Sequence, residues 1–314
     1  MPGERVYLRR RLVAAAGLLA VAGGAVALLA GGGDDDARAP LAGTGATPTA
    51  APAPPELPGG GRRLLPDRRV VAFYGAPQDE ELGALGIGTP DAAARRLLRQ
   101  ARAYERPGRP VQPALELIAS IANADPGEDG MYRTQQPPAV IDRYLRAARR
   151  HGMLLLLDIQ PGRADFFDEA MRLEHWLREP DVGLALDPEW RVGPGEVPGQ
   201  VIGSVDPREV NATSAWLEQL IVRHDLPQKL FLIHQFTNDM VDDTQVKERP
   251  GLAIVLNADG FGTHSVKRAK YHAFSGGAPR FHHGFKLFYE EDVGLMTPRQ
   301  VLQLRPAPDV VEYE

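Results

Sequence analysis

The chain has 314 residues, of which 43% are hydrophobic, and it carries a formal net charge of −5 with no cysteine. This length and composition allow one large domain or two small ones with a buried core. The absence of cysteine excludes disulfides, thiolate metal ligands, a cysteine nucleophile and a lipidated cysteine. The part expected to fold has no long basic run, which argues against nucleic acid as a partner, because phosphate binding needs clustered Lys and Arg.

The N-terminus has the charge pattern of a membrane-targeting segment. Arginines at positions 5 and 9–11 precede an uncharged run, residues 12–33, which is long enough to cross a bilayer as one helix. The positive charge holds the first end in the cytoplasm. The sequence Ala25-Val26-Ala27 also fits a cleavage site. We therefore predict that residues 1–33 are a signal anchor or a signal peptide. The membrane is then a partner, and the rest of the protein is extracytoplasmic, membrane-anchored or secreted.

Residues 34–67 are rich in alanine, proline and glycine and lack periodic apolar positions. This composition predicts an extended, solvated linker. The folded domain is accordingly expected to span residues 68–314.

In that domain, apolar strand-like segments alternate with segments of helical periodicity. The predicted strands are residues 69–75, 111–121, 153–160, 181–190, 228–236, 251–260, 280–292 and 308–314. The predicted helices are residues 89–105, 137–152, 165–179, 206–220 and 265–274, and a short one from residue 297. Thr89 is expected to cap the first of them, with Pro90 at its first position.

This alternation predicts an α/β fold with a parallel sheet, and the strand count suits a (β/α)8 TIM-type barrel. Several strands are continuously apolar, as expected when both faces are covered. An open, doubly wound sheet is the alternative. The first strand is followed by FYGAPQDEEL rather than by a glycine-rich phosphate loop, so a nucleotide-binding version is not expected.

Polar side chains recur where the predicted strands end. In a barrel of this type the chemistry lies at the carboxyl ends of the strands. Side chains alternate along a strand, so Asp158 and Gln160 share a face, as do Asp187 and Glu189. A charge beneath packed helices would be costly, so we expect these groups to point into the barrel mouth.

The predicted catalytic residues are Glu189, Asp187 and Asp158, because glycoside hydrolysis needs one protonated carboxyl group and one ionised carboxylate. Glu189 is the expected acid, and Asp187 or Asp158 the base or stabiliser. The predicted substrate-binding residues are Tyr74, Glu116, Gln160, Trp190, His234, Gln235, Asp259 and Lys286.

Each of these residues also has a purely structural interpretation. Asp187 and Asp158 fit helix capping, and Asp259 fits a turn. His234 fits a hydrogen-bonded core position, and Glu116 a buried paired charge. The repetition of polar ends on successive strands favours a site.

The segments VVAFYG, LLLDIQ, LALDPEW, IHQF and DGFG resemble those of a group of secreted or membrane-anchored bacterial TIM-barrel proteins that generally have no assigned activity. The resemblance runs from residue 69 to the C-terminus and implies the fold and the extracellular setting. At fold level only, the chain also resembles glycosidase barrels. Asp187 and Glu189 are similar to the end of the chitinase-like motif, but GLAL replaces the acidic run before them, and no Met-x-Tyr-Asp signature follows.

Three functions are compatible with these features. The first is an extracytoplasmic hydrolase of a cell-envelope glycan, expected to be a monomer without a cofactor. The second is a phosphodiesterase or lyase that uses Mg, Ca or Mn bound by Asp158, Asp187 and Glu189. The third is a non-catalytic carbohydrate-binding barrel.

Overall fold

The computed structural model describes residues 53–276 and 280–314. The predicted signal anchor or signal peptide, residues 1–33, lies outside the described residues, as does the first part of the predicted linker. Within the described ranges, no helix combines the length and the apolar character needed to cross a bilayer.

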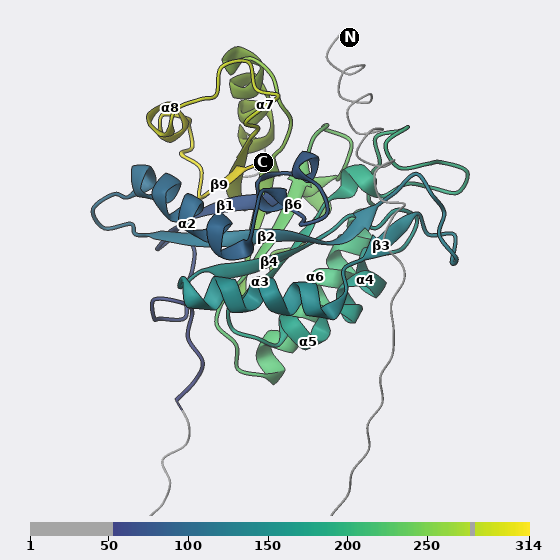
Figure 1. Ribbon diagram of the computed structural model, residues 1–314, viewed down its shortest axis with the longest axis horizontal. Coiled ribbons are helices and arrows are strands. Elements are labelled where there is room, and N and C mark those ends of the chain that lie inside the picture. The colour runs from purple at the N-terminus through teal and green to yellow at the C-terminus, as the bar shows by residue number, and fades with distance from the viewer. Residues whose placement is uncertain (1–52, 277–279) are drawn as a thin grey trace, which may run out of the picture.

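Eight parallel strands form a closed barrel (Figure 1). They are β1 (Arg69–Gly75), β2 (Val111–Ala122), β4 (Leu154–Ile159), β5 (Val182–Leu186), β6 (Lys229–Gln235), β7 (Leu252–Ala258), β8 (His282–Leu287) and β9 (Val310–Tyr313). Each strand pairs in parallel with the next, and β1 pairs with both β2 and β9, which closes the ring. The predicted TIM-type barrel is confirmed, and the open-sheet alternative is wrong.

Helices cover the outside of the barrel. They are α2 (Pro90–Ala101), α3 (Pro138–Arg150), α4 (Phe166–Arg172), α5 (Glu174–Leu177), α6 (Pro207–Arg223), α7 (His264–Gly276) and α8 (Pro298–Leu302). Figure 1 shows α3, α5 and α6 on one side of the strands and α7 and α8 on the other. The Thr89 side chain accepts a hydrogen bond from the Ala92 N–H, which confirms the predicted cap.

Short 3-10 helices lie in the loops: η1 (Glu80–Leu82), η2 (Ala84–Gly86), η3 (Arg102–Tyr104), η4 (Pro188–Trp190) and η5 (Asp243–Gln245). The predicted helix 165–179 is interrupted at Leu173, whose φ of −90° and ψ of 2° leave the α-helical region. The long loop after β2 contains a strand that was not predicted, β3 (Arg133–Gln135), which pairs antiparallel with the end of β2.

The lower half of the barrel interior, at the N-terminal ends of the strands, is apolar. Its inward side chains come from the first inward positions of the strands, such as Val70, Leu154 and Leu230. Leu57, Leu64 and Leu65 belong to the same buried cluster, and they close this end of the barrel. The N–H groups of Leu64 and Leu65 donate to Gln228 Oε1 at 2.8 and 3.0 Å.

The prediction of a solvated linker through residue 67 is therefore wrong for the stretch that carries these leucines. The proline- and glycine-rich composition around them hid three side chains that bury apolar surface against the barrel. The folded domain begins before Leu57 rather than at residue 68.

Candidate functional site

The upper half of the barrel interior is polar. Two residues beyond the apolar layer, on the same inward faces, each strand carries a polar side chain. Seven of these lie at or next to the end of their strand, and Glu116 lies in the middle of the longer β2. These eight buried side chains form a polar ring: Tyr74, Glu116, Asp158, Asp187, His234, Asn257, Lys286 and Glu312. The strand-end side chains thus converge inside the barrel, as expected. The ring also contains Asn257 and Glu312, which the prediction did not assign to the site.

His234 lies at the centre of one half of the ring. Its Nε2 atom is 3.0 Å from Glu116 Oε1, and its Nδ1 atom is 3.0 Å from Asp259 Oδ2. Burial by itself lowers the pKa of His234, but the carboxylates of Glu312, Asp259 and Glu116 outweigh burial, and the pKa is raised well above its ordinary value. As an imidazolium, His234 donates a hydrogen bond to a carboxylate from each ring nitrogen.

Lys286 is the second cation of the ring. Its Nζ atom is 2.7 Å from Glu314 Oε2 and 3.4 Å from Asp259 Oδ2, and it lies 3.5 Å from the centroid of the Tyr74 ring. Burial opposes the charge, but the carboxylates of Asp259 and Glu314 raise the pKa of Lys286 well above its ordinary value. Lys286 is therefore a permanent cation at neutral pH.

Tyr74, Asp158 and Gln160 form a hydrogen-bonded chain. The Tyr74 hydroxyl donates to Asp158 Oδ2 at 3.1 Å, and Gln160 Nε2 donates to the Tyr74 oxygen at 2.9 Å. Gln160 Oε1 accepts from the Ala122 N–H at 3.1 Å, which fixes the amide. Asp158 and Gln160 thus act from one face of β4, as predicted. Burial raises the pKa of Asp158 well above its ordinary value.

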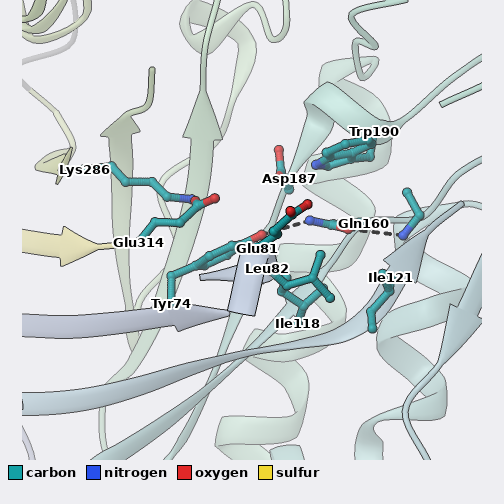
Figure 2. A pocket seen from close by; sticks show the side chains of 11 residues that line it. Tyr74, Glu81, Leu82, Ile118, Ile121, Gln160, Asp187, Trp190, Lys286 and Glu314 are labelled. Carbon is teal, nitrogen blue, oxygen red and sulfur yellow. Dashed lines mark hydrogen bonds and ion pairs between the residues drawn. The ribbon is translucent and has the colours of Figure 1, made fainter. Parts of the chain in front are cut away.

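A cavity of about 60 Å³ opens above this chain, with Tyr74, Gln160, Asp187, Trp190 and Lys286 among its lining residues. Figure 2 shows these side chains, which come from strands and from the segments that follow them, around the cavity. The volume holds a few water molecules and is well below the roughly 300–1,000 Å³ of sites that enclose a whole drug-sized ligand. In its present shape the cavity admits only the end of a substrate.

Six residues that border the cavity were not predicted. Ile118, Ile121 and Ala122 lie on β2, Glu81 and Leu82 come from η1 in the loop after β1, and Glu314 follows β9. Glu314 had a sequence signal, because it follows Glu312 by two positions and so shares its inward face. The loop residues had no comparable signal, since no periodicity fixes where a loop side chain points.

Other predicted residues lie outside the cavity lining. Glu116, Asp158 and His234 are deeper in the barrel, where they contact one another, and Asp259, just after β7, contacts His234. Glu189 is buried within η4, and burial, followed by the nearby Asp259 carboxylate, raises the pKa of Glu189 well above its ordinary value.

Gln235 is not part of the ring. It neighbours His234 on β6, so its side chain points to the opposite face of the strand. The structure therefore does not bring Gln235 together with His234, because consecutive residues of a strand face opposite sides.

Asn257 and Glu312 complete the ring without having been assigned to the site. Asn257 Nδ2 donates to Glu312 Oε2 at 2.7 Å, and both side chains are fully buried. Asn257 had the expected strand-end position. Glu312 lies in a strand of only four residues, where two valines give a weak periodic signal.

Carboxyl groups outnumber cations at this site. Within the described part of the chain, Glu116, Asp158 and His234 form the potential metal-binding group. Each residue offers one ligand atom, and these atoms lie within 4.8 Å of one another. The predicted set of Asp158, Asp187 and Glu189 is not such a group. The structure brings Asp158 together with Glu116 and His234 instead, because inward side chains of the neighbouring strands β2 and β4 meet that of β6 inside the barrel.

No protein-family model matches the chain, and no curated protein matches it. Among solved structures, a D-allulose 3-epimerase from Methylomonas sp. is similar at 12% identity and a TM-score of 0.36, covering 79% of this chain and 85% of its own. A 5-methylcytosine deaminase from Klebsiella pneumoniae has 12% identity and a TM-score of 0.32, covering 73% and 53% respectively, so this chain spans about half the deaminase's length.

A truncated 3-deoxy-D-arabino-heptulosonate 7-phosphate synthase from Thermotoga maritima is similar at 11% identity and a TM-score of 0.32, covering 72% of this chain and 75% of its own. Likeness at this level carries no argument about chemistry. The strand pairing and the ring define the class: a TIM-type barrel with an acid-rich, buried polar site at the carboxyl ends of its strands. What such a site does in this chain depends on its own residues.

Proposed function

We propose that the protein is a hydrolase that cleaves the end of a cell-envelope glycan by carboxyl acid–base chemistry at the barrel mouth. The observation that carries the proposal is the cavity, where Asp187 and Trp190 border the same space as Tyr74, Gln160 and Lys286. Carboxyl groups, an aromatic face and hydrogen-bonding groups around a small cavity suit the terminal unit of a polar polymer.

Asp187 and Glu189 are the proposed reacting pair. Burial raises the pKa of Glu189 well above its ordinary value, so this carboxyl group keeps its proton to a higher pH than an exposed glutamate, as suits a general acid. Asp187 borders the cavity and is the proposed base or nucleophile. Trp190 supplies a face for a sugar ring, and Lys286 and Gln160 bind hydroxyl groups.

Substrate entry requires the cavity to widen next to Glu189. The Gly- and Pro-rich loop of residues 191–206 packs on η4, where the Gly203 N–H donates to Glu189 O at 2.7 Å. We propose that displacement of this loop exposes the Glu189 carboxyl group to the substrate. Loops at this end of a barrel commonly have such a gating role.

The extracytoplasmic location belongs to the same proposal. Its support is the arginine-flanked apolar run within residues 1–33. Reporter fusions to residue 52 and to the C-terminus test it: a reporter that works only outside the cytoplasm is expected to be active in both. Activity of a cytoplasm-specific reporter would contradict this location.

The test of the hydrolase is the release of reducing ends from isolated envelope glycan by the full chain. Asp187→Asn and Glu189→Gln are expected to reduce the rate by about 10²–10⁴-fold, the usual contribution of a general acid or base. The matched control is Glu128→Gln, an exposed carboxyl group in the loop after β2 at the same end of the barrel, which is expected to keep the full rate.

Two outcomes contradict the hydrolase. One is unchanged release by both variants. The other is no release by the full chain together with retained glycan binding, which would favour the carbohydrate-binding barrel. A metal-dependent enzyme is the second candidate function, and the grouping of Glu116, Asp158 and His234 favours it.

A further inference from the structure

Three ring residues, from the neighbouring strands β2 and β4 and from β6, converge deeper in the barrel than the cavity. His234 Nε2 on β6 is 3.0 Å from Glu116 Oε1 on β2 and 3.9 Å from Asp158 Oδ1 on β4. Ligand atoms at about 2.0–2.2 Å from one ion lie about 3–4 Å apart. The three atoms therefore surround a point that small side-chain shifts would bring within bonding distance of each.

A buried oxygen at this point lacks a hydrogen-bond donor. Asp158 Oδ1 is inaccessible to solvent, and no donor in the described part of the chain reaches it. The Asp158 side chain is fully buried. Asp158 Oδ1 is also the oxygen that faces His234 Nε2, so the unpaired atom is directed into the cluster. Buried oxygens of this kind are rare without a partner, and a cation would supply one.

The imidazole of His234 is held in the orientation of a metal ligand. Its Nδ1 atom is 3.0 Å from Asp259 Oδ2, and Asp259 Oδ1 in turn accepts from the Gly260 N–H at 2.6 Å. Metal-binding histidines commonly donate their second N–H to a carboxylate, which fixes the tautomer and the ring. Here that contact leaves Nε2 facing Glu116 and Asp158.

We infer that Glu116, Asp158 and His234 bind a divalent first-row transition cation, Mn²⁺ or Zn²⁺, through two carboxylate oxygens and one imidazole nitrogen. The imidazole disfavours Mg²⁺ and Ca²⁺, which prefer oxygen ligands throughout. The bound ion replaces a proton on His234 Nε2, and it offsets part of the excess of carboxyl groups around the ring. Asp158 links the ion to the cavity, because its other oxygen accepts from the Tyr74 hydroxyl.

This inference is independent of the proposed hydrolase, because metal binding is measured without substrate. The full chain is stripped with a chelator, dialysed, and titrated with MnCl₂ by electron paramagnetic resonance and with ZnCl₂ by calorimetry. One ion per chain is expected to bind, with an increase in Tm. MgCl₂ and CaCl₂ are expected to bind at least about 100-fold more weakly.

The variants separate the possible ligand sets. Glu116→Gln, Asp158→Asn and His234→Gln are expected to weaken Mn²⁺ binding by at least about 100-fold, since each removes a ligand atom. Asp259→Asn is expected to weaken it by about 10–100-fold, because this residue only orients the imidazole. Asp187→Asn is the matched control: it removes a mouth carboxyl group outside the ligand set and is expected to bind normally.

Circular dichroism and a cooperative melt check that each variant folds. Where a ligand variant fails to fold, the electron paramagnetic resonance of Mn²⁺ bound to the wild-type chain supplies the test. Ligation by an imidazole couples the Mn²⁺ electron spin to a nitrogen nucleus, and this coupling is measured directly. Binding of well under one ion per chain overturns the inference, as does the absence of nitrogen coupling. Equal weakening by Asp187→Asn and Asp158→Asn would also overturn the ligand set.

Discussion

The two halves of the barrel interior share the same strands but differ in the chemistry of their side chains. On β6, Leu230 and Leu232 point into the lower half and His234 points into the upper half, in steps of two residues along one face. The backbone pairing is continuous through both halves. The lower half stabilises the fold by apolar burial, whereas the upper half buries charges that do not stabilise it by themselves.

Substitutions in the lower half are therefore expected to leave the site intact, whereas most substitutions in the upper half change its charge. The polar ring contains several carboxyl groups but only His234 and Lys286 as cations. Buried charges lower the free energy of unfolding unless each has a partner of opposite charge. Such a loss of stability is typical of functional sites. The predictions below test this contrast.

The largest expected effect is the loss of the buried lysine. Lys286→Met removes a buried cation from beside Glu314 and Asp259 and is expected to destabilise the protein by about 3–5 kcal/mol, as breaking a buried ion pair does. Urea unfolding measures the change. Lys247→Met, at an exposed position, is the control and is expected to change stability by less than about 0.5 kcal/mol. A loss below about 1 kcal/mol for Lys286→Met would show that the ring does not depend on this charge.

The second effect concerns the closure of the lower half. Leu64→Ala removes a fully buried side chain and is expected to cost about 2–5 kcal/mol through lost burial and a residual cavity. Val222→Ala, with a side chain that is 76% exposed, is the control. Metal binding is expected to stay normal in Leu64→Ala. A negligible stability change would show that the segment before β1 is not part of the core.

The third effect is a pH dependence from a buried lysine at the lower end of β6. Burial lowers the pKa of Lys229 to about 7, and its Nζ atom donates to the carbonyl oxygens of Glu179 and Val182, each at 2.7 Å. Between pH 7 and the unfolded value of 10.5, the unfolded chain binds a proton that the folded chain has lost. Stability from this group therefore rises with pH across that window.

The size of this rise is on the order of 2 kcal/mol between pH 7 and pH 9, because each pKa unit corresponds to about 1.4 kcal/mol. Urea unfolding at the two pH values measures it. Lys229→Met is expected to remove the rise, since methionine does not titrate. The change in unfolding free energy between pH 7 and pH 9 is compared for the wild type and Lys229→Met. The same change in both proteins would contradict the assignment of the pH dependence to Lys229.

The smallest expected effect is a gain. The folded pKa of Glu189 is raised above its ordinary 4.5, so between these values the folded chain retains a proton that the unfolded chain has lost. Stability from Glu189 is then lost as the pH rises through this window. Glu189→Gln removes this loss and is expected to stabilise the protein by about 0.5–2 kcal/mol at neutral pH. Thermal melts at pH 4 and pH 8 measure it, and equal effects at both would contradict it.

The sequence predicted the barrel well because long apolar strands and helical stripes have clear periods. The inward direction of Asp158 and Asp187 followed from alternation, since both end strands with apolar inward residues before them. His234 followed by the same rule, and that rule also shows why Gln235 faces away from it.

Other features depend on tertiary packing that no local pattern encodes. Leu57 and Leu64 lie among prolines and glycines, so their burial depends on the open lower end of the barrel. The pairing of β3 with β2 arises within a loop of turn-forming composition. The grouping of Glu116, Asp158 and His234 depends on how side chains from β2, β4 and β6 approach one another inside the barrel, which strand order alone does not specify.

The most direct test of the contrast between the halves is the rate of reducing-end release by Asp187→Asn and by Leu64→Ala, measured where both are folded. A catalytic upper half predicts a loss of about 10²–10⁴-fold for Asp187→Asn and a wild-type rate for Leu64→Ala. Equal rates for the two variants would contradict it.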